Sequence, residues 1–115
     1  MSVNRNHLIE LNEILEEEFG SLIETYISDS RVRLNQALAC LRSAEWEHAR
    51  KEFHCLKGSS ANIGAESFSA ICQHLEWLLK NGECPKLSEY ESNLEREYRS
   101  VVEALKDFLT GNDKT

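Results

Sequence analysis

Residues 53–65 read FHCLKGSSANIGA, and the spacing of the apolar side chains here predicts a helix that packs on a core. With about 100° of rotation per residue, one group of side chains falls in a sector about 80° wide. These side chains are Ala49, Phe53, Leu56, Ser60 and Ile63. Gly58 lies inside this helix, where a glycine costs about 1 kcal/mol relative to alanine. Helix stability alone does not explain that residue.

The same helical periodicity continues on both sides of this stretch. It predicts helices over Leu8–Phe19, Leu22–Leu41, about 46–63, Glu66–Lys80, and from about Ser88 to Phe108. No segment alternates with period two, so we expect no strand. Long helices joined by short turns favour an all-α fold, an antiparallel up-down-up-down four-helix bundle. The short first helix is expected to lie over one end of the bundle as an additional element.

Turn and capping residues set the expected helix boundaries. Residues that stop or break a helix are found at Gly20–Ser21, Asn62, Gly64 and Asn81–Gly82 before Pro85. Residues suited to the N-cap position, some with a capping-box glutamate three positions later, are Ser21 with Glu24, Ser43, and Ser88 with Glu91.

Composition limits the class of protein. A chain of 115 residues is expected to form one domain, residues 1–115, with a polar tail over 111–115 that frays. The formal charge of −7 disfavours binding to a nucleic acid, because a polyphosphate backbone repels an acidic surface. No apolar run is long enough to span a membrane, and the N-terminal residues lack the features of a signal peptide. We therefore expect a cytoplasmic protein and, by default, a monomer.

The outward face of the helix over residues 46–63 carries a group of side chains suited to one reaction. His54 lies roughly 140° from the centre of the apolar sector, with Arg50 one turn before it and Lys57 one turn after. A neutral imidazole is a competent nucleophile, and the two cations favour an anion such as a phosphoryl group. Gly58 and Ala61 remove bulk beside the histidine, so another protein could approach closely. Alternatively, Gly58 could permit close packing of a neighbouring helix.

The run from His54 to Ala65 resembles the signature of histidine-containing phosphotransfer (HPt) domains, approximately H-x-L/I-K-G-S/A-S/A-x-x-x-G. Cys72, Leu75 and Glu76 also occupy the familiar place in the following helix. The resemblance implies a stand-alone phosphorelay protein without kinase activity of its own. Such a protein accepts a phosphoryl group from the receiver domain of a hybrid sensor histidine kinase. It then passes the group to the receiver domain of a response regulator.

The resemblance also implies a role for each site residue. His54 would be phosphorylated, Lys57 would stabilise the phosphoryl group with electrostatic support from Arg50, and Gly58 would leave room for the partner. Some family members have a glutamine on the adjacent helix that bonds the histidine, where this chain has Glu76. That carboxylate could orient the imidazole or be an ordinary surface charge. No cofactor of the chain itself is implied, and the Mg²⁺ would belong to the partner receiver domain.

Two other readings remain open at this point. A helical bundle could bind a signalling partner without any phosphoryl transfer. A metal site could use His54, Cys55, Cys72 and His74, although these residues lack the spacing of a known site.

Overall fold

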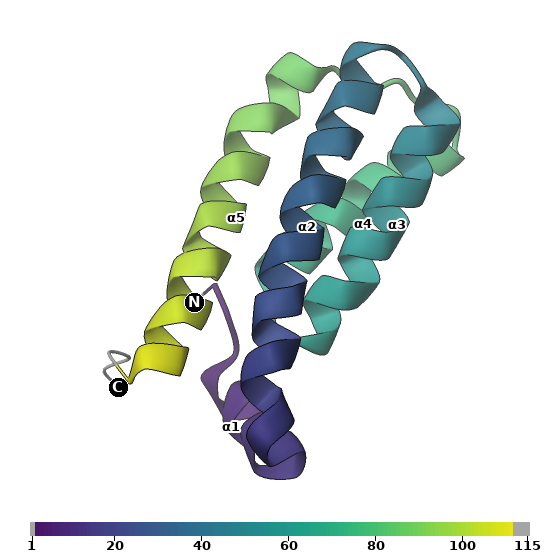
Figure 1. Ribbon diagram of the computed structural model, residues 1–115. Coiled ribbons are helices and arrows are strands. Elements are labelled where there is room, and N and C mark those ends of the chain that lie inside the picture. Colours follow the sequence, from purple (N-terminus) through teal and green to yellow (C-terminus); the bar gives the residue numbers. More distant parts are fainter. Residues whose placement is uncertain (1, 112–115) are drawn as a thin grey trace.

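The computed structural model describes residues 2–111 and shows helices joined by short turns (Figure 1). The elements are α1 (Arg5–Leu15), the single 3₁₀ turn η1 (Glu16–Glu18), α2 (Phe19–Arg42), α3 (Trp46–Asn62), α4 (Glu66–Lys80) and α5 (Leu87–Thr110). Helices α2 to α5 pack side by side, and α1 folds back at the end where α2 begins. The described part contains no strand, so the predicted all-α bundle with a short additional helix is confirmed. Of the tail 111–115 that is expected to fray, Gly111 is the C-cap of α5, and residues 112–115 lie outside the described range.

The core is a stripe of apolar side chains contributed by every long helix. Its most deeply buried members include Ile23, Leu34, Phe53, Leu56, Phe68, Leu75, Leu94 and Leu105, each exposed by 1% or less. Burial of one such side chain contributes about 1.5–3 kcal/mol relative to exposure. The bundle therefore depends on the helical period of these residues, which is the pattern that the sequence displays.

The start of α2 differs from the prediction. Gly20 and Ser21 do not break the chain but lie in the first turn of α2, so Ser21 with Glu24 does not form a capping box. The break comes earlier, at Glu16, whose φ of 50° is left-handed. Phe19 explains the shift, because it is 3% exposed and must share the helical phase of Ile23 to reach the core. The first helix accordingly ends at Leu15 rather than Phe19.

The two other predicted N-caps are also wrong. Ser43 is the C-cap of α2, followed by Ala44 at a φ of 59°. The N–H of Glu45 bonds the carbonyl of Cys40 at 2.8 Å, as in a Schellman motif. Helix α5 begins one residue before Ser88 and has no side-chain cap.

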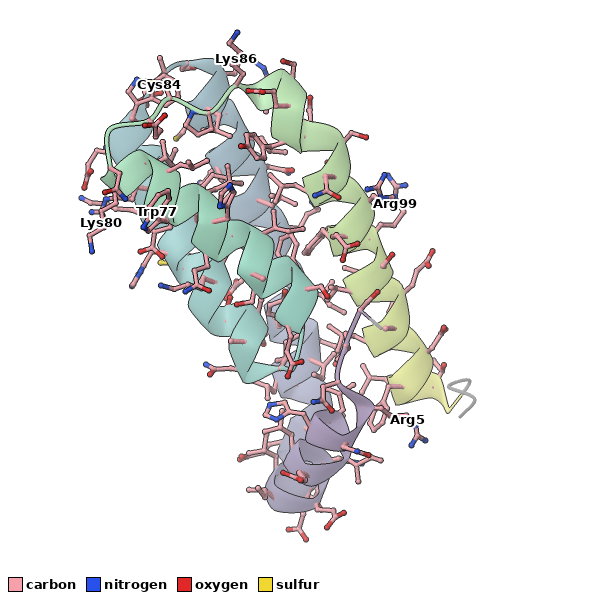
Figure 2. The ribbon with its side chains drawn as sticks, turned by 180° about the vertical axis from the view of Figure 1, so that it is seen from behind. Arg5, Trp77, Lys80, Cys84, Lys86 and Arg99 are labelled. Carbon is pink, nitrogen blue, oxygen red and sulfur yellow. The ribbon has the colours of Figure 1, made fainter. Side chains whose placement is uncertain are left out.

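The turns after α3 and α4 follow the prediction. Both are Schellman turns with a glycine in the left-handed region, Gly64 at a φ of 82° and Gly82 at 80°. The stop signals at these two positions are thus confirmed. Beyond Gly82, the connection to α5 passes Cys84 and Lys86, which lie at one end of the bundle in the reverse view (Figure 2).

The N-terminal segment packs on the turn that ends α3. The N–H of Asn4 donates to the carbonyl of Gly64 at 2.8 Å, and His7 Nε2 lies 2.7 Å from the carbonyl of Asn62. A Cβ added at Gly64 would lie 3.1 Å from the His7 ring. These contacts fix the end of the helix that carries the outward-facing group.

Candidate functional site

Helix α3 presents two faces, as its sequence predicts. Ala49, Phe53, Leu56 and Ser60 are fully buried and Ile63 is 2% exposed. The opposite face carries His54, whose side chain is 60% exposed. The apolar stripe therefore fixes the rotation of α3 and directs the imidazole outward.

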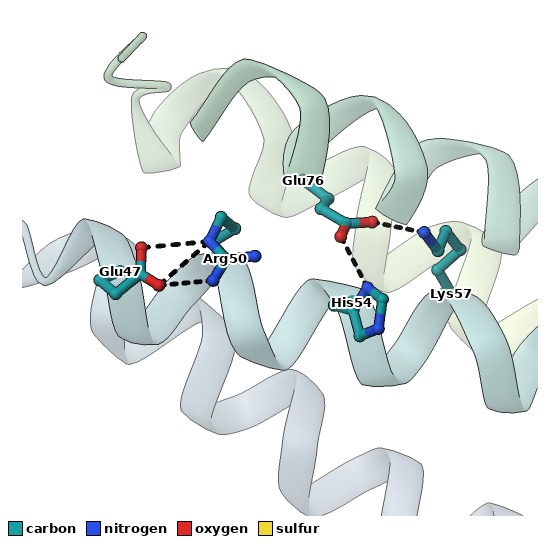
Figure 3. A network of polar contacts seen from close by, with 5 residues as sticks. All are labelled: Glu47, Arg50, His54, Lys57 and Glu76. Atoms are coloured by element: carbon teal, nitrogen blue, oxygen red, sulfur yellow. Dashed lines mark hydrogen bonds and ion pairs between the residues drawn. The ribbon is translucent and has the colours of Figure 1, made fainter. Parts of the chain in front are cut away.

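Glu76 from α4 reaches across to this outer face and joins two residues of α3 (Figure 3). Its Oε2 lies 2.7 Å from His54 Nδ1, and its Oε1 lies 2.7 Å from Lys57 Nζ. Because an ionised carboxylate only accepts hydrogen bonds, Nδ1 carries the hydrogen. In the neutral form of the ring, the lone pair is then on Nε2, the nitrogen that Glu76 does not contact.

The surroundings of Glu76 keep its carboxylate charged. Its side chain is only 12% exposed, and burial by itself raises the pKa of a carboxyl group. Hydrogen bonds from Lys57 and His54 outweigh burial and hold the Glu76 pKa below its ordinary value. The three side chains form a connected polar group at the surface of the α3–α4 pair.

Arg50 lies on the same face but is engaged elsewhere. Its Nε lies 3.1 Å from Glu47 Oε2, one turn earlier in α3, and among the residues drawn in Figure 3 its contacts are with Glu47. Of the two cations predicted beside the histidine, the structure therefore brings Lys57 into the group and pairs Arg50 with Glu47.

Gly58 is exposed and faces open space. A Cβ added there would have no atom within 4 Å outside the helix's own nearby backbone. Close packing of a neighbouring helix therefore does not explain this glycine. No side chain projects from the surface at Gly58, which agrees with the interpretation that a partner approaches His54 here.

Two supporting contacts were not predicted from the sequence. The Ser69 hydroxyl of α4 donates to the carbonyl of Lys57 at 2.8 Å and ties α4 to the site. Beneath the helix, the Tyr26 hydroxyl lies 2.7 Å from Ser60 Oγ. A serine or a tyrosine on an apolar stripe signals that a polar partner is needed, but the sequence does not say which one.

A groove runs between α2 and α3, and residues next to His54 and Gly58 in sequence line it. Its walls include Leu22, Thr25 and Asp29 from α2, with Cys55 and Ser59 from α3. Cys55 and Ser59 directly follow His54 and Gly58 in sequence. The groove thus lies on the α2 side of α3, whereas Glu76 reaches His54 from α4.

The structure does not assemble the four residues of the alternative metal site. Cys72 is fully buried, whereas Cys55 and His74 are exposed. Over residues 2–111, no three histidine, cysteine or acidic side chains are grouped as they would be to hold a metal ion. Within the same range, no helix is long and apolar enough to cross a membrane.

Comparisons with protein families, with known sequences and with solved structures all point to phosphotransfer proteins. The model of the Hpt domain family matches residues 21–110. The phosphorelay intermediate protein rdeA of Dictyostelium discoideum is 31% identical over 100 residues, which cover 86% of this chain and 39% of that protein. The chain thus spans well under half the length of this relative. The crystal structure of histidine-containing phosphotransfer protein B (HptB) from Pseudomonas aeruginosa PAO1 superposes with a TM-score of 0.86, at 29% identity and 92% coverage of both chains.

Proposed function

Because the chain belongs to the Hpt domain family, we propose that it carries a phosphoryl group on His54 between the receiver domains of a phosphorelay. The observation that supports this most directly is the contact that orients the imidazole. Glu76 Oε2 lies 2.7 Å from His54 Nδ1, which leaves Nε2 of the 60% exposed side chain without a contact to Glu76. In the neutral ring, an oriented nitrogen with a free lone pair on an exposed side chain suits attack on a group that another protein presents.

The transfer consists of one bond exchange. The Nε2 lone pair attacks the phosphorus of a phospho-aspartate, the P–O bond breaks, and its electron pair stays on the released carboxylate. In the return step, an aspartate oxygen of a second receiver attacks the phosphorus and the P–Nε2 pair returns to the ring. We propose that Mg²⁺ bound by the receiver neutralises the transferring group, and that this chain needs no cofactor of its own.

Lys57 is placed to stabilise the phosphoryl group. It lies one turn after His54, and its side chain is 30% exposed, so its ammonium can turn from Glu76 to a phosphoryl oxygen. Arg50 has a weaker role, since it is bound to Glu47 and contributes its charge from a distance. Gly58 leaves the space in which the receiver approaches.

The groove between α2 and α3 supplies a docking face next to the imidazole. Leu22, 38% exposed, offers apolar contact, and Thr25 and Asp29 offer polar contact. We propose that the receiver of a hybrid sensor kinase and that of a response regulator use this face in turn. We further propose that the protein acts as a monomer, because one copy of the chain carries all the residues of the site. We also propose that it acts in the cytoplasm.

The test is phosphoryl transfer from a phosphorylated receiver domain. The wild type should acquire a label that acid removes and base does not, and His54→Gln should acquire none. His74→Gln is the matched control, because His74 is an exposed histidine on α4 and should leave labelling unchanged. Normal labelling of His54→Gln would contradict the proposal. Partner binding without any labelling of the wild type would favour the alternative of a pure interaction module.

A further inference from the structure

Both oxygens of Glu76 are occupied before any phosphoryl group arrives. Oε2 accepts from His54 and Oε1 pairs with Lys57, each at 2.7 Å, and the side chain is 12% exposed. A glutamine at this position could accept the same hydrogen bond from Nδ1 with its amide oxygen. Orientation of the ring therefore does not require a carboxylate. What the carboxylate adds is a negative charge next to Nδ1.

That charge acts on the phosphorylated form of the ring. When Nε2 attacks phosphorus, the ring retains its Nδ1 hydrogen and becomes a cation that carries the phosphoryl group. If this proton stays, the P–Nε2 bond breaks to leave a neutral imidazole. If it is lost, the same bond must release an imidazolate anion, which is a far poorer leaving group. An opposite charge within hydrogen-bonding distance favours the cation.

The other charged groups around the ring do not replace Glu76. On α3, Lys57 is a cation and disfavours a protonated ring, and Arg50 is held by Glu47. On α2, the charged residues lining the adjacent groove are Asp29 and Arg33, and Arg33 is bound to Glu52 at 2.9 Å. Glu76 is thus the carboxylate in direct contact with His54 among residues 2–111.

We propose that the negative charge of Glu76, beyond its hydrogen bond, keeps phosphorylated His54 protonated at Nδ1 and so keeps the phosphoryl group ready to leave. The inference rests on the proposed function and adds to it a determinant of how long the phosphorylated state lasts. Lys57 completes the arrangement. When it turns to the phosphoryl group, Glu76 loses its second partner and its charge acts on the ring alone.

The test measures loss of the phosphoryl group after chemical phosphorylation with phosphoramidate, so no partner protein is needed. Once the donor is removed, ³¹P NMR follows the phosphohistidine signal between pH 5 and pH 9. This range extends about 1.5 pH units or more on either side of the ordinary pKa of an imidazole. Glu76→Gln keeps a hydrogen-bond acceptor and removes the charge. We expect loss at pH 7 to slow by about three- to tenfold and the pH–rate profile to move to lower pH.

The matched control is Glu83→Gln, which removes the same charge from an exposed side chain beyond α4 and should decay as the wild type does. His54→Gln identifies signal that arises from other histidines. Wild-type decay and an unmoved pH profile in Glu76→Gln would overturn the inference while leaving the proposed function standing. A wild-type protein that acquires no more phosphohistidine than His54→Gln would overturn both. Glu76→Ala, which also removes the acceptor, should decay at least as slowly as Glu76→Gln.

Discussion

At the scale of single residues, the floor of the site depends on buried hydroxyl groups. Ser60 is fully buried directly beneath the outward face of α3, and its Oγ lies 2.7 Å from the hydroxyl of Tyr26. Tyr26 is 6% exposed, so water cannot readily replace either partner. A buried polar group that loses its partner costs about 1–3 kcal/mol, whereas loss of both partners together costs less.

Tyr26→Phe should therefore lower the free energy of unfolding by about 1–3 kcal/mol, because Ser60 keeps a buried hydroxyl without a partner. Adding Ser60→Ala should restore part of the loss. Urea unfolding followed by circular dichroism measures both changes. Tyr90→Phe is the control, since Tyr90 is half-buried, its ring packs near His74, and its hydroxyl makes no hydrogen bond within residues 2–111. Equal effects of the two Phe substitutions would contradict a structural role for the Tyr26–Ser60 bond.

At the scale of elements, the sequence predicts which face of a helix is buried better than it predicts where the helix begins and ends. The position of Phe53 and Leu56 on one stripe fixes which way His54 points, because a helix has a single period. The start of α2 depends instead on where Phe19 packs, and Phe19 reaches the core against Phe108 of α5, with ring centroids 5.7 Å apart. A local signal such as Gly20–Ser21 carries no information about that distant contact.

The same reasoning explains what the sequence could say about the site. His54, Lys57 and Gly58 share one helix, so their spacing alone brings them together. Glu76 joins them only through the register of α4 against α3, which depends on the packing of both helices. The sequence therefore allowed two readings of Glu76, and the structure supplies the contacts that place its carboxylate beside the imidazole.

The two helical glycines with open surroundings make a matched pair. Gly58→Ala should raise the free energy of unfolding by about 0.5–1 kcal/mol, because nothing lies within 4 Å of the added Cβ and alanine favours the helix. It should also slow phosphoryl transfer from a receiver by about tenfold or more, since the methyl group stands one turn from His54 in the path of the partner. Urea unfolding and transfer kinetics measure the two effects.

Gly20→Ala is the control, because Gly20 also has open space around it, lies in the first turn of α2 and is not one of the residues that line the proposed docking groove. It should stabilise the protein by a smaller amount, as expected in a first turn, and leave transfer unchanged. If Gly58→Ala stabilises the fold and transfers at the wild-type rate, the glycine does not serve partner access.

At the scale of the whole molecule, the four cysteines lie at different depths in the bundle. Cys55 and Cys84 are exposed, Cys40 is half-buried and Cys72 is fully buried. Burial raises the pKa of the Cys72 thiol to about 12. Because the thiolate is the reactive form, Cys72 is protected both by its neighbours and by its protonation. It lies on α4, among core side chains of the other long helices.

Iodoacetamide should therefore modify Cys55 and Cys84 in the native protein and reach Cys72 only when the bundle unfolds. Peptide mass spectrometry at rising urea concentrations gives the free energy of opening at each cysteine. For Cys72 this value should equal the global free energy of unfolding from circular dichroism. A Cys55→Ser, Cys84→Ser variant checks that modification at the surface does not itself open the core. Modification of Cys72 well below the global transition would show that α4 separates from the bundle first, and the contact between Glu76 and His54 would then break before the fold does.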